Sequence, residues 1–273
     1  MRGLPPMPLE GTVQDILDGP APLGRPDREL VGETIVRRIL AAHGEAVIAI
    51  ALYGSNATGR DGPYSDIEIW TALEDGTPVG DERVTHEWVW GAGKAEVNVW
   101  SEAAMRQWAA EVDERWSLTH GKFVHAVRLF ERRAGFVEDI RRLAAAPSIE
   151  AIRAGMEGGI IDSLFEGLGK LRNAVALKRA GEGPRHFLHF AESAGQLTAL
   201  AQSYCFASGS TFLEEAAALT GPSGYAELIA LARSGVLADS LALAQAADAY
   251  WAGLAKWIEL IGLDLAARCR ADL

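Results

Sequence analysis

The sequence predicts an α+β protein in which a small mixed sheet with its helices comes first and an all-α bundle follows. Two observations support this prediction. Between residues 46 and 100, short apolar or alternating runs are separated by turn signals such as DGPYS and EDGTPVGD, which is the pattern of strands. From Gly135 onward, apolar residues recur at spacings of three and four, alanine becomes frequent and strand signals end, which is the pattern of packed helices.

The expected domains follow from this change of pattern. Residues 1–27 contain closely spaced prolines, from Pro5 to Pro26, so we expect an extended or poorly ordered arm. An α/β domain is expected over residues 28–132 and a helical domain over residues 133–273.

Periodicity also predicts the individual elements. The run at 46–53 is almost wholly apolar, as in a central strand, whereas the later runs alternate, as in strands with one exposed face. In the first domain we expect helices over 29–43 and 102–112, and strands over 46–53, 66–73, 83–90, 94–100 and 122–130. In the second domain we expect helices near 135–146, 148–178, 185–206, 210–219, 223–234 and 237–261.

The composition limits the classes of partner. A formal net charge of −11, from 26 basic and 37 acidic side chains, argues against nucleic-acid binding and suits a cationic small substrate, although solubility alone would also account for it. Cys205 and Cys269 give neither a disulfide framework nor a zinc spacing, which favours a reducing cytoplasm. We find no signal-peptide pattern and no apolar run of membrane-spanning length, so no membrane partner is expected.

Asp66 and Glu68 stand two residues apart in a run that otherwise resembles core. Side chains of a strand alternate between faces, so both carboxylates are expected on one face and Ile67 and Ile69 on the other. Two adjacent carboxylates repel each other, and a Mg²⁺ ion between them would relieve that repulsion. The alternative is an exposed strand face that carries two solvated acids.

The surrounding residues favour a site for a metal–triphosphate complex. Gly54-Ser55 ends the preceding strand, where glycine lets the backbone approach a phosphate and Ser55 can donate hydrogen bonds. Glu96, on a later strand, can join the two acids if the strands are neighbours. Farther on, Glu166 and Lys170 share one helix face with Asp162 and Asn173, which is either a functional face or a solvated one with a weak ion pair.

The pattern G-S followed by D-x-E resembles the nucleotidyltransferases of the DNA polymerase β superfamily. The ordered blocks are similar to those of the kanamycin-type aminoglycoside nucleotidyltransferases, and they extend over roughly residues 30 to 265. The blocks are YGS…DGPYSDIE, HEW, KAEVN, WSLTHG, LFEGLGKLRN, PSGY and SGVLADS. The resemblance implies a polymerase-β-like domain followed by a helical bundle, and AMP transfer from Mg–ATP to a sugar hydroxyl, the 4′-hydroxyl by this family's pattern.

The resemblance also implies roles for single residues. Asp66 and Glu68 would bind Mg²⁺ for catalysis, and Glu166 would be the general base. Glu96 would lie beside the metal and the acceptor, as a ligand of one or the other. The nucleotide would be bound by Gly54, Ser55, Ser65, Arg60 and Lys170. The ammonium groups of the acceptor would be bound by Glu87, Glu96, Asp162 and Glu166.

The family resemblance further implies a homodimer with shared active sites, in which the partner supplies the base and the lysine. Two departures from the family pattern stand out. Thr58 occupies the place of an arginine, with Arg60 two residues farther on, and Asp162-Ser163 replaces two consecutive acids. These changes predict rearranged phosphate contacts and an altered drug range.

Two other function classes compete with this interpretation. A polymerase-β-like enzyme that modifies a protein or tRNA, as in toxin–antitoxin systems, would share the site, but the acidic charge argues against tRNA. A non-catalytic, ligand-sensing descendant of the fold would have no need of Asp66, Glu68 and Glu166 together.

Overall fold

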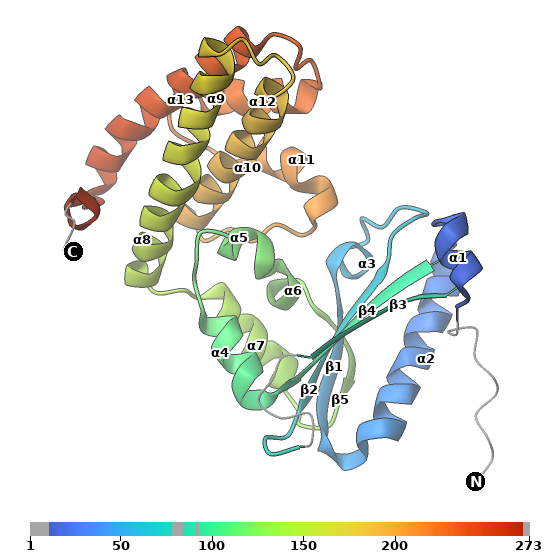
Figure 1. Ribbon diagram of the computed structural model, residues 1–273. Coiled ribbons are helices and arrows are strands. Elements are labelled where there is room, and N and C mark those ends of the chain that lie inside the picture. The colour runs from blue at the N-terminus through green and yellow to red at the C-terminus, as the bar shows by residue number, and fades with distance from the viewer. Residues whose placement is uncertain (1–10, 78–83, 91–92, 270–273) are drawn as a thin grey trace. The chain divides into compact units, whose positions relative to one another are not determined.

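A five-stranded mixed sheet forms the centre of the first of two compact units in the computed structural model, which describes residues 11–77, 84–90 and 93–269 (Figure 1). The strand order is β3-β4-β2-β1-β5, with β2 and β4 parallel and the other neighbours antiparallel. The strands are β1 (Val47–Tyr53), β2 (Ile67–Leu73), β3 (Val84–Trp90), β4 (Gly93–Ser101) and β5 (Val127–Glu131). The predicted α+β class is confirmed.

Helices cover both faces of this sheet (Figure 1). On one face, α2 (Arg25–His43) buries Val31, Ile35 and Ile39 against apolar side chains of the strands, among them Ile67 and Ile69. The opposite face packs on α4 (Glu102–Ala110), α6 (Gly121–Val124) and α7 (Phe136–Ala145). Burial of Ile67 and Ile69 on the α2 face confirms the predicted alternation, because it leaves Glu68 on the other face.

The segment before α2 differs from the extended arm expected from its prolines. Thr12 and Asp15 form a capping box, each side chain accepting from the backbone of the other, and α1 (Val13–Asp18) follows. Pro26 lies in the first turn of α2, where its fixed φ and missing N–H cost nothing. Residues 1–10 of the expected arm lie outside the described residues.

The last strand of the sheet is shorter than predicted. Residues 121–124 form α6, and β5 begins only at Val127. Gly121 and Phe123 are buried, and Phe123 packs on Trp100 and Trp108, so tertiary packing favours a helical turn where the local pattern suggested a strand.

The second unit is helical, apart from loops. It comprises residues 111–119, 147–206 and 211–273, so α7 groups with the first unit, although the sequence placed its residues with the helical domain. Its main helices are α5 (Trp116–Thr119), α8 (Ile149–Gly158), α9 (Glu166–Ala176), α10 (Gly183–Ala201), α11 (Phe212–Ala216), α12 (Tyr225–Ser234) and α13 (Ser240–Ile261).

The helix predicted over 148–178 is one helical run from Ile149 to Ala176, but its middle is not α-helical. A π-helical segment, Gly159–Phe165, separates α8 from α9. Among the described helices of the chain, none combines the length and apolar composition required to cross a bilayer.

Candidate active site

Four polar side chains form one row across the sheet, on the face that also packs on α4, α6 and α7. Backbone pairing places Tyr53 of β1 beside Glu68 of β2, and Glu68 beside Glu96 of β4. On its other side, Glu96 pairs with Glu87 of β3. Residues paired across neighbouring strands share a face, so the row brings three carboxylates together. We call the row formed by Tyr53, Glu68, Glu96 and Glu87 the acidic row.

Asp66 and Glu68 lie at the start of β2 and concentrate negative charge there. Asp66 is the residue before the strand, and Glu68 is half-buried. Burial, together with the charges of Asp66 and Glu96, raises the pKa of the Glu68 carboxyl to about 7. Lys122 and Lys94 oppose this shift without cancelling it. The predicted crowding of the two acids is therefore present in the structure.

Glu96 has an environment different from that of Glu68. Its Oε1 accepts hydrogen bonds from Tyr53 Oη at 2.5 Å and from Asn98 Nδ2 at 2.7 Å. Burial alone would raise the pKa of Glu96, but these hydrogen bonds bring it below its usual range. Burial and the hydrogen bond to Glu96 raise the pKa of Tyr53, so Tyr53 stays a donor. Glu96 is thus held ionised and in a fixed orientation.

Two lysines border the acidic row. Lys94 Nζ lies 3.8 Å from Asp66 Oδ2 and 3.6 Å from Glu87 Oε1. The ammonium group of Lys122, on α6, lies 5.6 Å from the centroid of the Tyr53 ring. The sequence analysis missed both lysines. Lys94 is two residues before Glu96, and that same-face spacing was the available signal.

The Gly54-Ser55 turn touches the acidic row directly. Gly54 has a φ of 69° and begins α3 (Gly54–Thr58). A Cβ at this position would lie 1.7 Å from Glu68 Oε2, so any side chain here would have to displace the Glu68 carboxylate. Ser55 is buried, and Thr58 Oγ1 donates to the Gly54 and Ser55 carbonyls at 3.2 Å each. The structure therefore brings the predicted phosphate turn and the predicted metal ligand together.

The other predicted nucleotide ligands of this unit lie in the loop after α3. Ser65 Oγ accepts from the backbone N–H of Gly62 at 3.0 Å, which closes the turn that precedes Asp66. Arg60 is exposed, and its backbone N–H donates to the Ser55 carbonyl at 2.9 Å.

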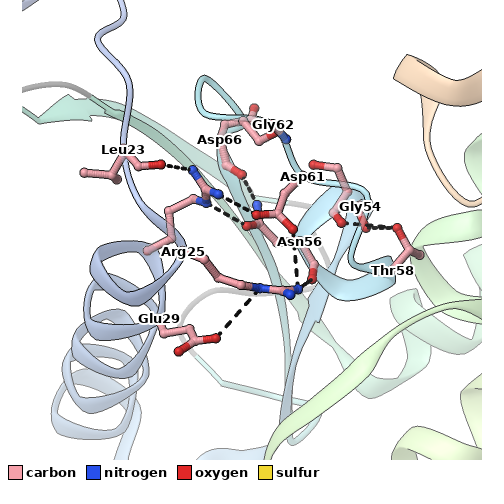
Figure 2. Close-up of polar contacts among 12 residues, drawn as sticks. Leu23, Arg25, Glu29, Gly54, Asn56, Thr58, Asp61, Gly62 and Asp66 are labelled. Carbon is pink, nitrogen blue, oxygen red and sulfur yellow. Dashed lines mark hydrogen bonds and ion pairs between the residues drawn. The ribbon is translucent and has the colours of Figure 1, made fainter.

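A buried ion pair holds this loop in place (Figure 2). Arg28 of α2 and Asp61 are 5% and 6% exposed, and their side chains are paired. Arg28 Nε donates to Asn56 Oδ1 at 3.0 Å, and the Asn56 amide donates to the Asp66 carbonyl. Buried charges persist only with such partners, so the network ties α2, α3 and the start of β2 together. It therefore positions Asp66, although no sequence pattern linked Arg28 to Asp61.

The acids suit a metal ion that takes part of its ligands from a nucleotide. In the described part of the chain, no three His, Cys, Asp or Glu side chains are grouped as a metal-binding cluster. Mg²⁺ at nucleotide sites needs only one or two carboxylates, because phosphates and water complete its shell. Asp66 and Glu68 fit this requirement, since their mutual repulsion is what a cation relieves. Glu96 is already engaged by Tyr53 and Asn98, which fits a ligand to the acceptor better than a third metal ligand.

The remaining candidates lie in the second unit. Lys170 Nζ is 2.6 Å from Glu166 Oε1, both side chains are about half exposed, and the lysine lowers the pKa of Glu166. Asp162 is exposed and lies in the π-helical segment that precedes Glu166. Segments of this kind interrupt α-helices often at functional sites.

Comparisons with known proteins bear on this arrangement. Residues 134–264 match the KNTase C-terminal domain. Over 252 residues, the chain is 31% identical to a protein from Staphylococcus aureus named aminoglycoside nucleotidyltransferase (4'), and the alignment covers 90% of this chain and 96% of that protein. The chain belongs to the aminoglycoside nucleotidyltransferase (4') family.

A second relative supports membership of this family. A protein of the same name from a Bacillus species shows the same 31% identity over 252 residues, with 90% and 96% coverage. The crystal structure of a nucleotidyltransferase-like protein from Exiguobacterium sibiricum has a TM-score of 0.48 at 13% identity, and covers 83% of this chain and 74% of that one. The kanamycin-type resemblance is confirmed, and the enzyme class is that of a nucleotidyltransferase with a nucleotide co-substrate.

Proposed function

We propose that this enzyme transfers AMP from Mg–ATP to the 4′-hydroxyl of a kanamycin-like aminoglycoside, releases pyrophosphate and confers resistance to the drug. The observation that carries the proposal is the Glu68 carboxylate lying against Gly54 and close to the charge of Asp66, in a chain of the aminoglycoside nucleotidyltransferase (4') family.

The first unit provides the nucleotide end of the reaction. Asp66 and Glu68 are the proposed Mg²⁺ ligands, and the ion, when bound, supplies positive charge that stabilises the phosphate oxygens and the leaving pyrophosphate. Because Gly54 has no side chain, the Glu68 carboxylate lies directly against the turn, which brings a proposed Mg²⁺ ligand next to the backbone that we assign to the phosphates. We assign the phosphates to Gly54, Ser55, Ser65, Arg60 and Lys170.

The outer part of the acidic row suits a polyammonium acceptor. Glu87 is 53% exposed and neighbours Glu96, whose carboxylate Tyr53 and Asn98 hold in one orientation. Two adjacent acids, one exposed and one held in place, can pair with two ammonium groups of one sugar ring. We assign Glu87 and Glu96 to acceptor binding, with Asp162 and Glu166 from the second unit.

Glu166 is the proposed general base, and it removes the proton from the attacked hydroxyl. A base of this kind contributes about 10²–10⁴-fold to the rate. Lys170 now pairs with Glu166 at 2.6 Å and lowers its pKa. When Lys170 binds phosphate instead, Glu166 loses this cation and becomes a stronger base than it is in the ion pair. We propose a homodimer with shared active sites, in which the partner copy supplies both residues.

Product analysis tests the proposal. Purified protein is incubated with Mg–ATP and kanamycin, pyrophosphate is assayed, and the drug is examined by mass spectrometry and NMR. We expect a drug–AMP adduct at the 4′-oxygen, and no adduct with an aminoglycoside that lacks a 4′-hydroxyl. Transfer of AMP to tRNA or protein in a cell extract, without any drug adduct, would establish the competing function instead.

A further inference from the structure

The segment before α2 is fastened to the sheet unit at both of its ends. At the first end, a Cβ on Gly11 would lie 2.0 Å from the Val89 carbonyl oxygen, so the segment starts in close contact with β3. At the other end, the backbone N–H of Leu23 donates to the Pro63 carbonyl at 2.8 Å. The segment therefore runs from the edge strand to the loop that leads into Asp66.

A cavity of about 410 Å³ lies between this segment, that loop and the ends of β3 and β4. Its volume falls within the range of small-molecule sites, about 300–1,000 Å³. One part of its wall is Asp66, the proposed metal ligand, with Lys94 beside it. The cavity thus borders the proposed metal ligand, which holds the nucleotide phosphates through the metal ion in the proposed function.

The rest of the wall is mostly apolar. It includes Ile16 of α1 and Tyr64 of the loop, each 62% exposed, together with Pro20 and Leu23. The polar groups are few, and two of them serve the local fold. The Asp15 carboxylate accepts from the Thr12 backbone N–H at 2.6 Å, and the Ser65 hydroxyl accepts from Gly62.

The mostly apolar wall of the cavity suits one of the two proposed substrates, the aminoglycoside and the nucleotide, better than the other. An aminoglycoside carries ammonium and hydroxyl groups and little apolar surface, so it requires carboxylates, which the row at Glu87 and Glu96 provides. A nucleobase has two flat faces that stack on aromatic and aliphatic side chains. A mostly apolar cavity next to a phosphate and metal site therefore matches the nucleobase.

We propose that the cavity between the N-terminal segment and the Asp66 loop receives the nucleobase of the co-substrate, with Tyr64 and Ile16 as its contact surfaces. The proposal rests on the proposed function, because it takes the phosphates to lie at Asp66 and Gly54. Stacking is tolerant of base identity, so the cavity binds purine nucleotides without strong preference between them.

Two variants on this wall and one matched control test the proposal. Ile16→Asp and Tyr64→Ala change the cavity surface, whereas Leu17→Asp places the same charge on the same helix at a residue that is 72% exposed and does not line the cavity. The binding of Mg–ATP and of Mg–tripolyphosphate, which has no base, is measured by calorimetry, and KM for kanamycin is measured in parallel.

We expect Ile16→Asp and Tyr64→Ala to weaken Mg–ATP binding about tenfold, a typical effect of losing one stacking contact. In both variants, tripolyphosphate binding and KM for kanamycin should stay unchanged. Leu17→Asp should bind ATP as the wild type does. Tyr64→Phe, which keeps the aromatic ring that Tyr64→Ala removes, should also bind ATP as the wild type does. Equal ATP affinity in all variants would overturn the base site, and so would a selective rise in KM for kanamycin. If the wild type binds neither ATP nor tripolyphosphate, the proposed function itself fails.

Discussion

The carboxylate of Glu68 occupies the space that any side chain on Gly54 would need, since a Cβ there would lie 1.7 Å from Glu68 Oε2. A turn with positive φ and a half-buried acid of the neighbouring strand are thereby in direct contact. Two constraints, backbone conformation and close approach, meet at this single glycine.

Gly54→Ala is therefore expected to displace Glu68 as well as strain the turn. A left-handed φ costs alanine about 1–2 kcal/mol, and misplacing a catalytic ligand by about 1 Å can cost on the order of 100-fold in kcat. Gly59→Ala is the matched control, because Gly59 has a φ of 70° and its nearest neighbour is an Arg25 nitrogen at 3.7 Å. Both variants should lose similar stability in urea unfolding, but only Gly54→Ala should lose activity. Equal kcat values would contradict the assignment.

Arg28 should be essential for stability, unlike the nearby Arg25. Arg28→Met leaves Asp61 buried without its main partner, so we expect a loss of about 3–5 kcal/mol in the free energy of unfolding. Arg25 is 53% exposed and lies 3.4 Å from Asp61, and Arg25→Met should cost at most about 1 kcal/mol. Chemical denaturation of the two variants measures this difference.

A double variant separates the positioning role of Arg28 from its structural role. Arg28→Met with Asp61→Leu removes both buried charges and should recover much of the stability. Asn56 then lacks its hydrogen bond from Arg28, so Asp66 is less well held. We expect half-maximal activity to need more Mg²⁺ than in the wild type. A double variant with the wild-type Mg²⁺ dependence would show that the network serves the fold alone.

Glu131 should make stability depend on pH. Its carboxylate accepts backbone hydrogen bonds from Val137 at 2.8 Å and Gly135 at 3.1 Å, at the start of α7. Burial alone would raise the pKa of Glu131, but these bonds lower it, so its stabilising effect is complete above the unfolded-state pKa and is lost as the pH falls through the folded-state pKa.

Glu131→Gln should therefore cost about 1 kcal/mol at neutral pH, and the difference from the wild type should shrink below about pH 4. Glu74→Gln, which removes a surface pair with Arg133, should change stability by less than about 1 kcal/mol. Free energies of unfolding of the wild type and both variants are measured at neutral pH and below about pH 4. A Glu131→Gln deficit that persists in acid would rule out the carboxylate as its cause.

Shared active sites predict complementation between two inactive variants. Asp66→Asn and Glu166→Gln are each expected to be inactive as homodimers. In a mixed dimer with shared sites, one site combines the intact Asp66 of one copy with the intact Glu166 of the other. Random mixing should restore about a quarter of wild-type activity, because half of the dimers are mixed and each has one complete site. No recovery in co-refolded mixtures that form dimers would place both residues of each site on one chain.

The local sequence pattern was sufficient to predict which face of β2 carries Glu68, but it did not predict which strands lie beside β2. Alternation predicted that Glu68 faces away from Ile67 and Ile69, because it depends only on strand geometry. The parallel pairing of β2 with β4, which puts Glu96 beside Glu68, depends on strand order, and no local signal specifies it.

Long-range contacts account for most of what the sequence did not predict. Arg28 and Asp61 are paired across more than thirty residues, and Lys122 reaches Tyr53 from a turn that resembled a strand. Asn98 was within reach of sequence analysis, because it lies two residues after Glu96 on the same face of an otherwise apolar strand.

The most direct test of the central claim compares kanamycin-dependent pyrophosphate release from Mg–ATP by the wild type, Glu68→Gln and Glu87→Gln. If Glu68 holds Mg²⁺ and Glu87 binds only the acceptor, Glu68→Gln should lose at least about 100-fold in kcat, while Glu87→Gln should keep its kcat and show a higher KM for kanamycin. Wild-type kcat in a folded Glu68→Gln protein would contradict the account.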